Sequence, residues 1–356
     1  LVSRPSYDPN LYVTGFPTVL YNELRDSPAK PFLNRAIRGQ YPAASTIKPF
    51  IGLAGVDTGV TSCTATNDFK GQYQLPNEDR YKFDWKRGGH GNVNMIEGLQ
   101  HSCDVYFYDV ARRIGVDKIA EMANKFGLGE KVGIDLPGER SGVIPTKAWK
   151  EANIGEPWQG GETLVTSIGQ GFVLATPLQL GVMVARIAAG GKKVIPRLAR
   201  GYREGEKTVA YPVPEFEDLG IPSEHMKMIF QGMDAVSNNP RGTAYKYRIK
   251  DEGWELAGKT GTAQVRRITL AERQAGVFKN EDLPWRRRDH GLFVAYAPVD
   301  NPRYACAVVV EHGSGSKSAA PIARDILRET QRRDPANTPA VPLQHTAEAT
   351  NTADEV

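Results

Sequence analysis

The chain has 356 residues, of which 40% are hydrophobic and 24% charged, so it has enough apolar residues for one large core or two domains of ordinary size. Its 45 basic and 41 acidic residues are mixed along the sequence and leave a net charge of +4, which argues against a nucleic-acid partner. Three cysteines are too few for a disulfide scaffold, and no apolar run approaches the roughly 18 residues of a membrane span.

Helices are expected mainly in the middle of the chain. Residues 1–44 contain Pro, Asn and Tyr in short stretches and predict irregular structure, and residues 57–91 indicate a polar surface excursion. The strongest helix start combines Thr176 as the cap, Pro177 at the first helical position and Gln179 at the third. Periodicity and end signals, including caps at Asn94 and Asp117, predict helices over residues 45–55, 94–101, 105–115, 117–127, 176–190, 223–235 and 319–330.

Three strand-like segments lie late in the chain, over residues 255–263, 291–297 and 304–311. The last two flank a segment with Pro298 and Pro302 at its ends, which is typical of a hairpin turn. Helices in the middle and strands near the end predict an α+β fold with an antiparallel sheet. From residue 333 onward the sequence lacks an apolar face, so we expect residues 333–356 to form a disordered tail.

Ser45 and Lys48 have the spacing of two residues on one helix face. A serine hydroxyl is a weak nucleophile until a base takes its proton, and a lysine is such a base only when neutral, which burial and neighbouring cations favour. The helix N-terminus at Ser45 also favours developing negative charge. Ser-x-x-Lys occurs by chance in many chains, and its ordinary interpretation is a capped helix with a solvated lysine.

Two further motifs carry candidate catalytic and substrate-binding residues. Ser102-Cys103-Asp104 supplies a second hydroxyl that can relay a proton between Lys48 and a leaving amine. Lys259-Thr260-Gly261-Thr262 lies on the first predicted strand, where a lysine and two hydroxyls suit a substrate carboxylate and the glycine admits a ligand close to the backbone.

The order Ser-x-x-Lys, Ser-x-Asp and Lys-Thr-Gly resembles that of penicillin-binding proteins and serine β-lactamases. The segments that are similar to class B penicillin-binding protein transpeptidases are residues 40–49, 167–171, 176–179, 242–244 and 258–264. Ala43-Ala44 stands where that family usually has Pro-Gly. The resemblance covers residues 1–331, and Asp104, Asp84-Trp85 and Gly89-His90-Gly91 point to the elongation-specific branch of the family.

The resemblance implies an antiparallel sheet covered by helices plus an all-helical subdomain, with residues 1–332 as the transpeptidase domain. It also implies the periplasmic domain of an inner-membrane protein, so we expect the membrane anchor and a membrane-proximal pedestal to lie outside this chain. The implied ligands are peptidoglycan stem peptides that end in D-Ala-D-Ala and β-lactams. A membrane glycan polymerase and elongation-complex proteins are the implied partners, bound through those outer segments.

Two acyl transfers make up the implied reaction. Ser45 attacks the D-Ala-D-Ala carbonyl and expels the terminal D-Ala, and the amine of a neighbouring stem peptide then resolves the acyl-enzyme. Lys48 is the implied general base and Ser102 the relay, while the backbone N–H groups of Ser45 and Thr262 form the oxyanion hole. The residues implied to bind the substrate carboxylate belong to the third motif: Lys259, Thr260, Gly261 and Thr262.

Residues 57–103 are also a candidate metal-binding excursion. Their soft and harder ligand types suit a four-ligand structural zinc site formed by Asp68, Asp84, His90 and Cys103, although the spacing matches no common zinc signature. Because Cys103 lies inside the second motif, a metal there would brace Ser102. The alternatives are a disulfide between Cys63 and Cys103, which an oxidising periplasm permits, and polar residues on a surface loop. The chemistry itself requires no cofactor.

Other interpretations stay open at this point. A division-specific class B transpeptidase is the nearest rival, disfavoured by Asp104, which is expected either to orient Lys48 or to face away. A class D-like β-lactamase shares the three motifs but hydrolyses its adduct and usually has a shorter chain. A non-catalytic scaffold would keep the fold alone, and intact Ser45, Lys48, Ser102 and Lys259 argue against it.

Overall fold

The computed structural model describes residues 1–76, 78–212, 214–266, 268, 272, 276–335 and 345–346. Its central feature is an antiparallel sheet in the order β7 (Ala257–Ala263), β8 (His290–Ala297), β9 (Tyr304–Val310). Every residue of β8 except His290 is buried, because this middle strand has a neighbour on each edge and helices on both faces. The three predicted strands and the hairpin between the last two are confirmed.

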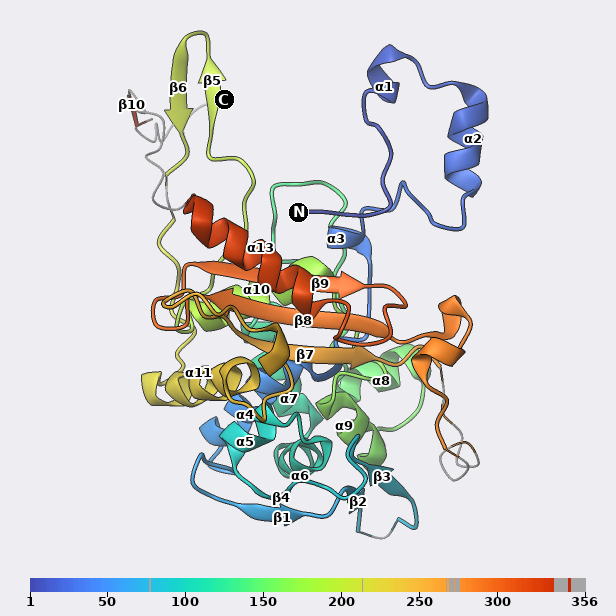
Figure 1. The fold of residues 1–356 in the computed structure, drawn as a ribbon, viewed down its shortest axis with the longest axis vertical. Coiled ribbons are helices and arrows are strands. Elements are labelled where there is room, and N and C mark those ends of the chain that lie inside the picture. The colour runs from blue at the N-terminus through green and yellow to red at the C-terminus, as the bar shows by residue number, and fades with distance from the viewer. Residues whose placement is uncertain are drawn as a thin grey trace, which may run out of the picture.

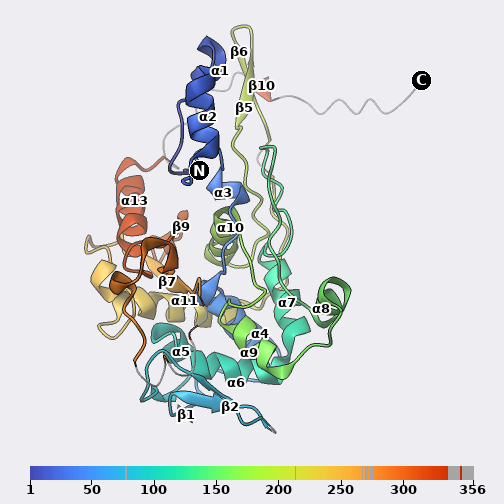
Figure 2. The ribbon, with the colours of Figure 1, turned by 90° about the vertical axis from the view of Figure 1, so that its right-hand side faces the viewer.

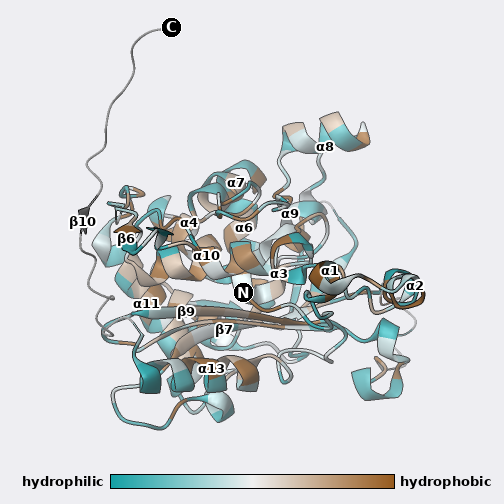
Figure 3. Cartoon of the chain, turned by 90° about the horizontal axis from the view of Figure 1, so that it is seen from above, coloured by the Kyte–Doolittle hydropathy of each residue, from teal (hydrophilic) through white to brown (hydrophobic). Residues whose placement is uncertain are grey.

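Helices cover both faces of this sheet (Figure 1). Figure 3 shows α13 (Ala320–Arg333) on one side and α10 (Pro177–Ala188) and α11 (Ser223–Asn238) on the other, with the strands between them largely hydrophobic. The buried residues of α13 are Ala320, Ala323 and Leu327, a helical spacing that directs one apolar stripe to the sheet.

A helical subdomain lies beyond α10 and α11 (Figure 2). Its helices are α4 (Lys48–Asp57), α5 (Met95–Gln100), α6 (Asp104–Ile114), α7 (Val116–Lys125), α8 (Lys147–Ile154) and α9 (Gly160–Ser167). The central helix is α4, which is buried from Lys48 through Val56 and packs against α5, α6, α7 and α11. Burial on all sides explains why its sequence is almost continuously apolar. The predicted α+β class with a helical subdomain is confirmed.

Residues 67–93 contain two small antiparallel strand pairs at the outer edge of this subdomain. β1 (Asn67–Phe69) pairs with β4 (Gly91–Val93), and β2 (Gln72–Gln74) pairs with β3 (Tyr81–Phe83). The expected surface excursion is therefore built of strands, which are too short for the alternation that identifies a strand in sequence.

Residues 1–44 were predicted to be irregular, and this prediction is wrong. They contain α1 (Leu11–Thr14), α2 (Thr18–Asp26) and α3 (Arg35–Arg38). Neither α1 nor α2 buries a residue, so no apolar stripe marks them; edge contacts among aromatic rings between residues 7 and 32 hold them instead. This lobe and the hairpin of β5 (Gly201–Glu204) and β6 (Lys207–Ala210) project at the same end of the molecule (Figure 1).

The predicted capping boxes at Asn94 and Thr176 are confirmed. The cap proposed at Asp117 is wrong: Gly115, with φ of 82°, precedes α7, and Asp117 lies in its first turn. Short 3₁₀ turns occupy η1 (Ala44–Ile47), η2 (Tyr245–Tyr247), η3 (Asn280–Asp282) and η4 (Trp285–Arg287). No helix among the described residues is long and apolar enough to cross a membrane.

The predicted tail over residues 333–356 falls largely outside the described residues. The last helix ends at Arg333, followed by Asp334 in a left-handed conformation. Residues His345–Thr346 form β10, which pairs with β6 in parallel; residues 336–344 and 347–356 are not described.

Candidate active site

Ser45 lies at the entrance to the buried central helix. The 3₁₀ turn η1 continues directly into α4, and the Lys48 backbone N–H donates to the Ser45 carbonyl. Because a 3₁₀ helix has three residues per turn, Ser45 and Lys48 lie on the same side. Ser45 is partly exposed and Lys48 is completely buried, so a reachable hydroxyl lies one turn from a lysine that is shielded from water.

The backbone just before Ser45 is strained. Ala44 has φ of 51°, in the left-handed region that costs an alanine about 1–2 kcal/mol. The chain therefore keeps at Ala44 a conformation that glycine adopts more readily than alanine. The Ala44 N–H donates to the Gly169 carbonyl at 2.8 Å, and a Cβ on Gly169 would lie 2.2 Å from the Ala44 carbonyl oxygen. The absence of a side chain at residue 169 thus lets its loop support the turn that presents Ser45.

Replacing Gly169 with alanine is expected to destabilise the protein by about 3 kcal/mol, because a left-handed backbone cost adds to a steric clash with Ala44. Gly190→Ala is a matched control, with φ of 68° against 67° for Gly169 and nothing within 4 Å of its Cβ position. It should lose only about 1 kcal/mol. Denaturant unfolding measures both losses, and equal losses in the two variants would contradict the close packing of this loop on Ala44.

Ser102 is presented by the junction between α5 and α6. The capping box of Asn94 and Glu97 starts α5, and the Cys103 side chain caps α6 by accepting from the Tyr106 N–H. Between the two helices Ser102 is buried and has φ of 52°, a conformation that a residue other than glycine keeps only when its surroundings enforce it. This turn points the Ser102 hydroxyl at both motif lysines.

The third motif lies on β7, the sheet strand that packs against η1. A Cβ on Gly261 would lie 2.8 Å from a methyl carbon of Thr46, so glycine allows the strand to approach the nucleophile turn. Lys259 is completely buried, Thr260 bonds to Thr243 at 3.0 Å through their hydroxyls, and Thr262 is exposed on the rim.

Four of the predicted residues form one hydrogen-bonded network. The Ser102 Oγ accepts from Lys48 Nζ at 3.2 Å and from Lys259 Nζ at 2.8 Å. Since a hydroxyl has two acceptor sites and one proton, this leaves the Ser102 proton free to point elsewhere. Lys48 also donates to Asp104 Oδ1 at 2.6 Å, so Asp104 orients Lys48 and does not face away. Among the described residues no hydrogen bond joins Lys48 to the Ser45 hydroxyl.

The charges of this network are unequal, with two lysines and one carboxylate in a buried space. Burial, and then the charge of Lys48, lower the pKa of Lys259 well below its usual value, while Asp104 opposes this shift. Among the described residues Lys259 has hydrogen bonds to Ser102 and Thr260 but no ion pair, so its protonated form is a suitable receptor for an anionic group of a ligand.

Two rim residues were not singled out from the sequence. Gln170 donates to the Thr262 carbonyl at 3.1 Å and so connects the 167–171 loop to β7. Thr243 reaches Thr260 from the segment that follows α11. Gln170 lies between two glycines and Thr243 follows one. A polar residue beside glycine was therefore the sequence signal that could have marked these two positions as part of the site.

Behind Ser102, three of the four predicted metal ligands come together. Asp84, His90 and Cys103 offer ligand atoms that all lie within 4.8 Å of one another. The Cys103 sulfur lies 3.3 Å from Asp84 Oδ2, and His90 Nδ1 lies 3.6 Å from the same oxygen. Both ring nitrogens of His90 are buried without a hydrogen-bond partner among the described residues. A buried imidazole needs such partners, so this donor set fits a cation such as zinc.

Asp68, the fourth predicted ligand, does not belong to this group. It is exposed on β1 opposite Asn92, and the strand turns its side chain away from the buried face that Phe69 occupies. Cys63 and Cys103 are both free cysteines, so the alternative disulfide is not formed. Burial raises the pKa of the Cys103 thiol, an effect that a bound cation would reverse.

Comparison with known proteins agrees with this arrangement. Residues 1–328 match the family described as the penicillin binding protein transpeptidase domain. The chain is 38% identical over 347 residues to the peptidoglycan D,D-transpeptidase MrdA of Escherichia coli K12, and the match covers 96% of this chain and 54% of that protein. The chain thus spans about half the length of the curated relative it matches.

Solved structures give the same result. Penicillin-binding protein 2 (PBP2) of Pseudomonas aeruginosa, in complex with WCK 5153, superposes with a TM-score of 0.80 at 36% identity, covering 99% of this chain and 73% of that one. PBP2 of Helicobacter pylori in complex with MreC superposes with a TM-score of 0.81 at 30% identity, covering 93% and 57%. The chain therefore belongs to the penicillin-binding protein transpeptidase family.

Proposed function

We propose that this chain is the catalytic domain of a peptidoglycan D,D-transpeptidase that acts in cell elongation, with residues 1–332 as the transpeptidase domain and Ser45 as the nucleophile. One observation carries the proposal: Lys48, Ser102 and Lys259 are joined by hydrogen bonds beside a partly exposed serine. The similarity to MrdA of Escherichia coli over 96% of the chain supports the elongation assignment.

In the first acyl transfer, the Ser45 hydroxyl attacks the carbonyl of a D-Ala-D-Ala peptide and gives its proton to Lys48, which acts as general base. The backbone N–H groups of Ser45 and Thr262 stabilise the oxyanion. Collapse of the tetrahedral intermediate breaks the C–N bond, and the leaving D-Ala amine receives a proton through Ser102. The product is an ester on Ser45 and free D-Ala.

The carboxylate of the substrate, or of a β-lactam, binds to Lys259, Thr260 and Thr262, with Gly261 keeping the strand open to it. Asp104 has a positioning role, because it accepts a hydrogen bond from Lys48 Nζ and so holds the Lys48 amine beside Ser102. This role accounts for a carboxylate close to an anion-binding site, since its oxygen is engaged by Lys48.

We place this domain in the periplasm, as part of an inner-membrane protein. Elongation proteins are proposed as its partners, since a related PBP2 of Helicobacter pylori is solved in complex with MreC. A membrane glycan polymerase is a further proposed partner, and segments outside this chain are proposed to make these contacts.

The direct test is release of D-Ala from a synthetic peptide that ends in D-Ala-D-Ala, measured with the wild-type chain and with Ser45→Ala. Release by the wild type alone supports the assignment. Rapid hydrolysis of a penicillin without D-Ala release would instead indicate a β-lactamase, and no reaction with either compound would indicate a scaffold.

Zinc is the metal that we propose for Asp84, His90 and Cys103, with Asp68 no longer among the ligands. When bound, such an ion supplies structural cross-linking between the excursion and the Ser102 turn. Its ligands would hold Cys103 at the start of α6, and so hold the adjacent Ser102 in place.

Removal of this metal is expected to lower the melting temperature by about 5 °C, because a ligand present well above its Kd adds a few kcal/mol to the folded state. Cys103→Ser should lose the bound zinc, and Cys63→Ser, which changes a free cysteine outside the group, should keep it. Metal analysis and thermal unfolding before and after chelation check both statements. A metal-free protein with an unchanged melting temperature would refute the site.

A further inference from the structure

An open pocket with a volume of about 380 Å³ lies between the β2–β3 hairpin and α9. We call it the α9 pocket; its lining includes Glu78, Arg80, Lys82, Gly161, Glu162 and Phe172. Figure 1 shows β2 and β3 beside α9, on the side of the helical subdomain below β7. This volume is in the range of small-molecule sites, and it is large enough for one long amino-acid side chain.

Charges of both signs face the α9 pocket. Glu162 is already neutralised, because it pairs with the buried Lys150 at 2.7 Å. In the part of the chain that the structure describes, Glu78, Arg80 and Lys82 have no ion pair. The Glu78 carboxylate lies 3.9 Å from the position of a Cβ on Gly161, so it faces the first turn of α9. The pocket thus presents two cations and one anion to a ligand.

This pocket adjoins the active site through one short loop. Gly171 and Phe172 line it, and the preceding residue, Gln170, donates to the carbonyl of Thr262 on β7. One residue further back, Gly169 packs on Ala44, next to the nucleophile. The same loop therefore contacts both the α9 pocket and the strand that carries Lys259.

We propose that the α9 pocket binds the acceptor of the second acyl transfer, an amine-bearing peptide end that also carries a carboxylate. Arg80 and Lys82 bind the carboxylate, and Glu78 offsets their repulsion of an ammonium ion. A simple amine lacks the carboxylate that the two cations attract. The pocket therefore selects amines that also bear a carboxylate. This inference rests on the proposed function, and what it adds is the place and the residues that bind the acceptor of the second step.

The step conserves atoms and protons. The bound amine, in its neutral form, attacks the ester carbon on Ser45 and forms the new C–N bond. The ester C–O bond breaks, and the proton lost by the amine passes to the Ser45 oxygen. The products are a peptide amide and free Ser45, with no oxidant, reductant or other reactant required.

The test measures how the acyl-enzyme divides between water and an added amine. A D-alanyl thioester acylates the chain, and mass spectrometry gives the ratio of amide to hydrolysed product with meso-2,6-diaminopimelate and with 1,5-diaminopentane, the same chain without carboxylates. The quotient of the two ratios is compared between proteins, so the intrinsic reactivities of the amines cancel. It also does not depend on how fast the acyl-enzyme forms.

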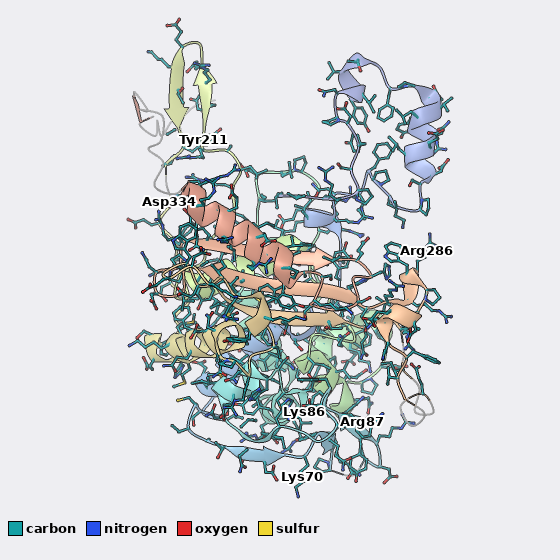
Figure 4. The ribbon with its side chains drawn as sticks, in the orientation of Figure 1. Lys70, Lys86, Arg87, Tyr211, Arg286 and Asp334 are labelled. Atoms are coloured by element: carbon teal, nitrogen blue, oxygen red, sulfur yellow. The ribbon has the colours of Figure 1, made fainter. Side chains whose placement is uncertain are left out.

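We expect the double variant Arg80→Gln/Lys82→Gln to lower this quotient at least about tenfold, since charge-assisted hydrogen bonds are lost. Lys70→Gln, a control on an exposed lysine at the outer edge of the same subdomain (Figure 4), should keep the wild-type value. Gly161→Leu, which fills the pocket without changing charge, should lower amide formation from diaminopimelate.

A quotient within about twofold of wild type in the double variant would overturn the pocket assignment, as would an acyl-enzyme that forms no amide with either compound. Both results would leave acylation of Ser45 intact. Absence of any Ser45 adduct in the wild type would instead contradict the proposed function itself.

Discussion

Replacement of Lys48 by methionine is expected to slow the acylation of Ser45 by about 10³-fold, the usual contribution of a general base. Methionine preserves the unbranched shape of the side chain in a fully buried position, so the packing of α4 changes little. What is lost is the amine that contacts Ser102 and takes the proton of Ser45. The rate of labelling by a fluorescent penicillin measures the effect.

The same substitution also removes the partner of Asp104, whose side chain is only 14% exposed. An uncompensated carboxylate in such a place costs about 3–5 kcal/mol, and the resulting instability has to be separated from the loss of catalysis. The double variant Lys48→Met/Asp104→Asn removes the stranded charge and should recover stability without recovering the rate. Acylation of Lys48→Met within tenfold of wild type would exclude Lys48 as the base.

Lys259→Gln is expected to lower the second-order rate constant of acylation by about 30- to 150-fold, because a charge-assisted hydrogen bond to the ligand carboxylate is worth about 2–3 kcal/mol. Glutamine keeps a donor near Ser102 but has no charge. The variant should need a higher ligand concentration to reach half of its maximal acylation rate, while the rate at saturating ligand should change less. The reason is that Lys259 binds the carboxylate and is not the base.

The lowered pKa of Lys259 should also be visible in the pH dependence of acylation. Raising the pH removes the proton from Lys259, and because its pKa lies well below the usual lysine value, the cation is lost at an unusually low pH. Wild-type acylation at low ligand concentration should therefore decline on the alkaline side. The Lys259→Gln variant should lack this decline, and an identical alkaline limb in both proteins would show that another group produces it.

The active-site residues were predictable because each motif lies on an element with local signals. The capping box of Asn94 and Glu97 marks the start of the helix before Ser102. The capping box of Thr176 and Gln179 marks the start of α10, which packs on the sheet. The strand with Lys259 belongs to a sheet whose buried runs stand out in sequence. Spacing along the chain then placed Ser45 and Lys48 on one side of a helix.

Features that depend on tertiary contacts were not predictable in this way. The role of Asp104 stayed open because only the packing of α6 against α4 shows that it reaches Lys48. Asp68 was chosen as a metal ligand by residue type, yet the pairing of β1 with β4 leaves it exposed. The supporting contact of Gly169 on Ala44 joins residues 125 positions apart, and nothing local indicates it.

Intact-protein mass spectrometry after brief incubation with a penicillin tests whether Ser45 is a nucleophile that β-lactams acylate. Peptide mapping locates any adduct. We expect a stable one-to-one adduct on the peptide that contains Ser45 and no adduct on Ser45→Ala. Unmodified protein beside intact drug, or an adduct on another residue, would contradict it.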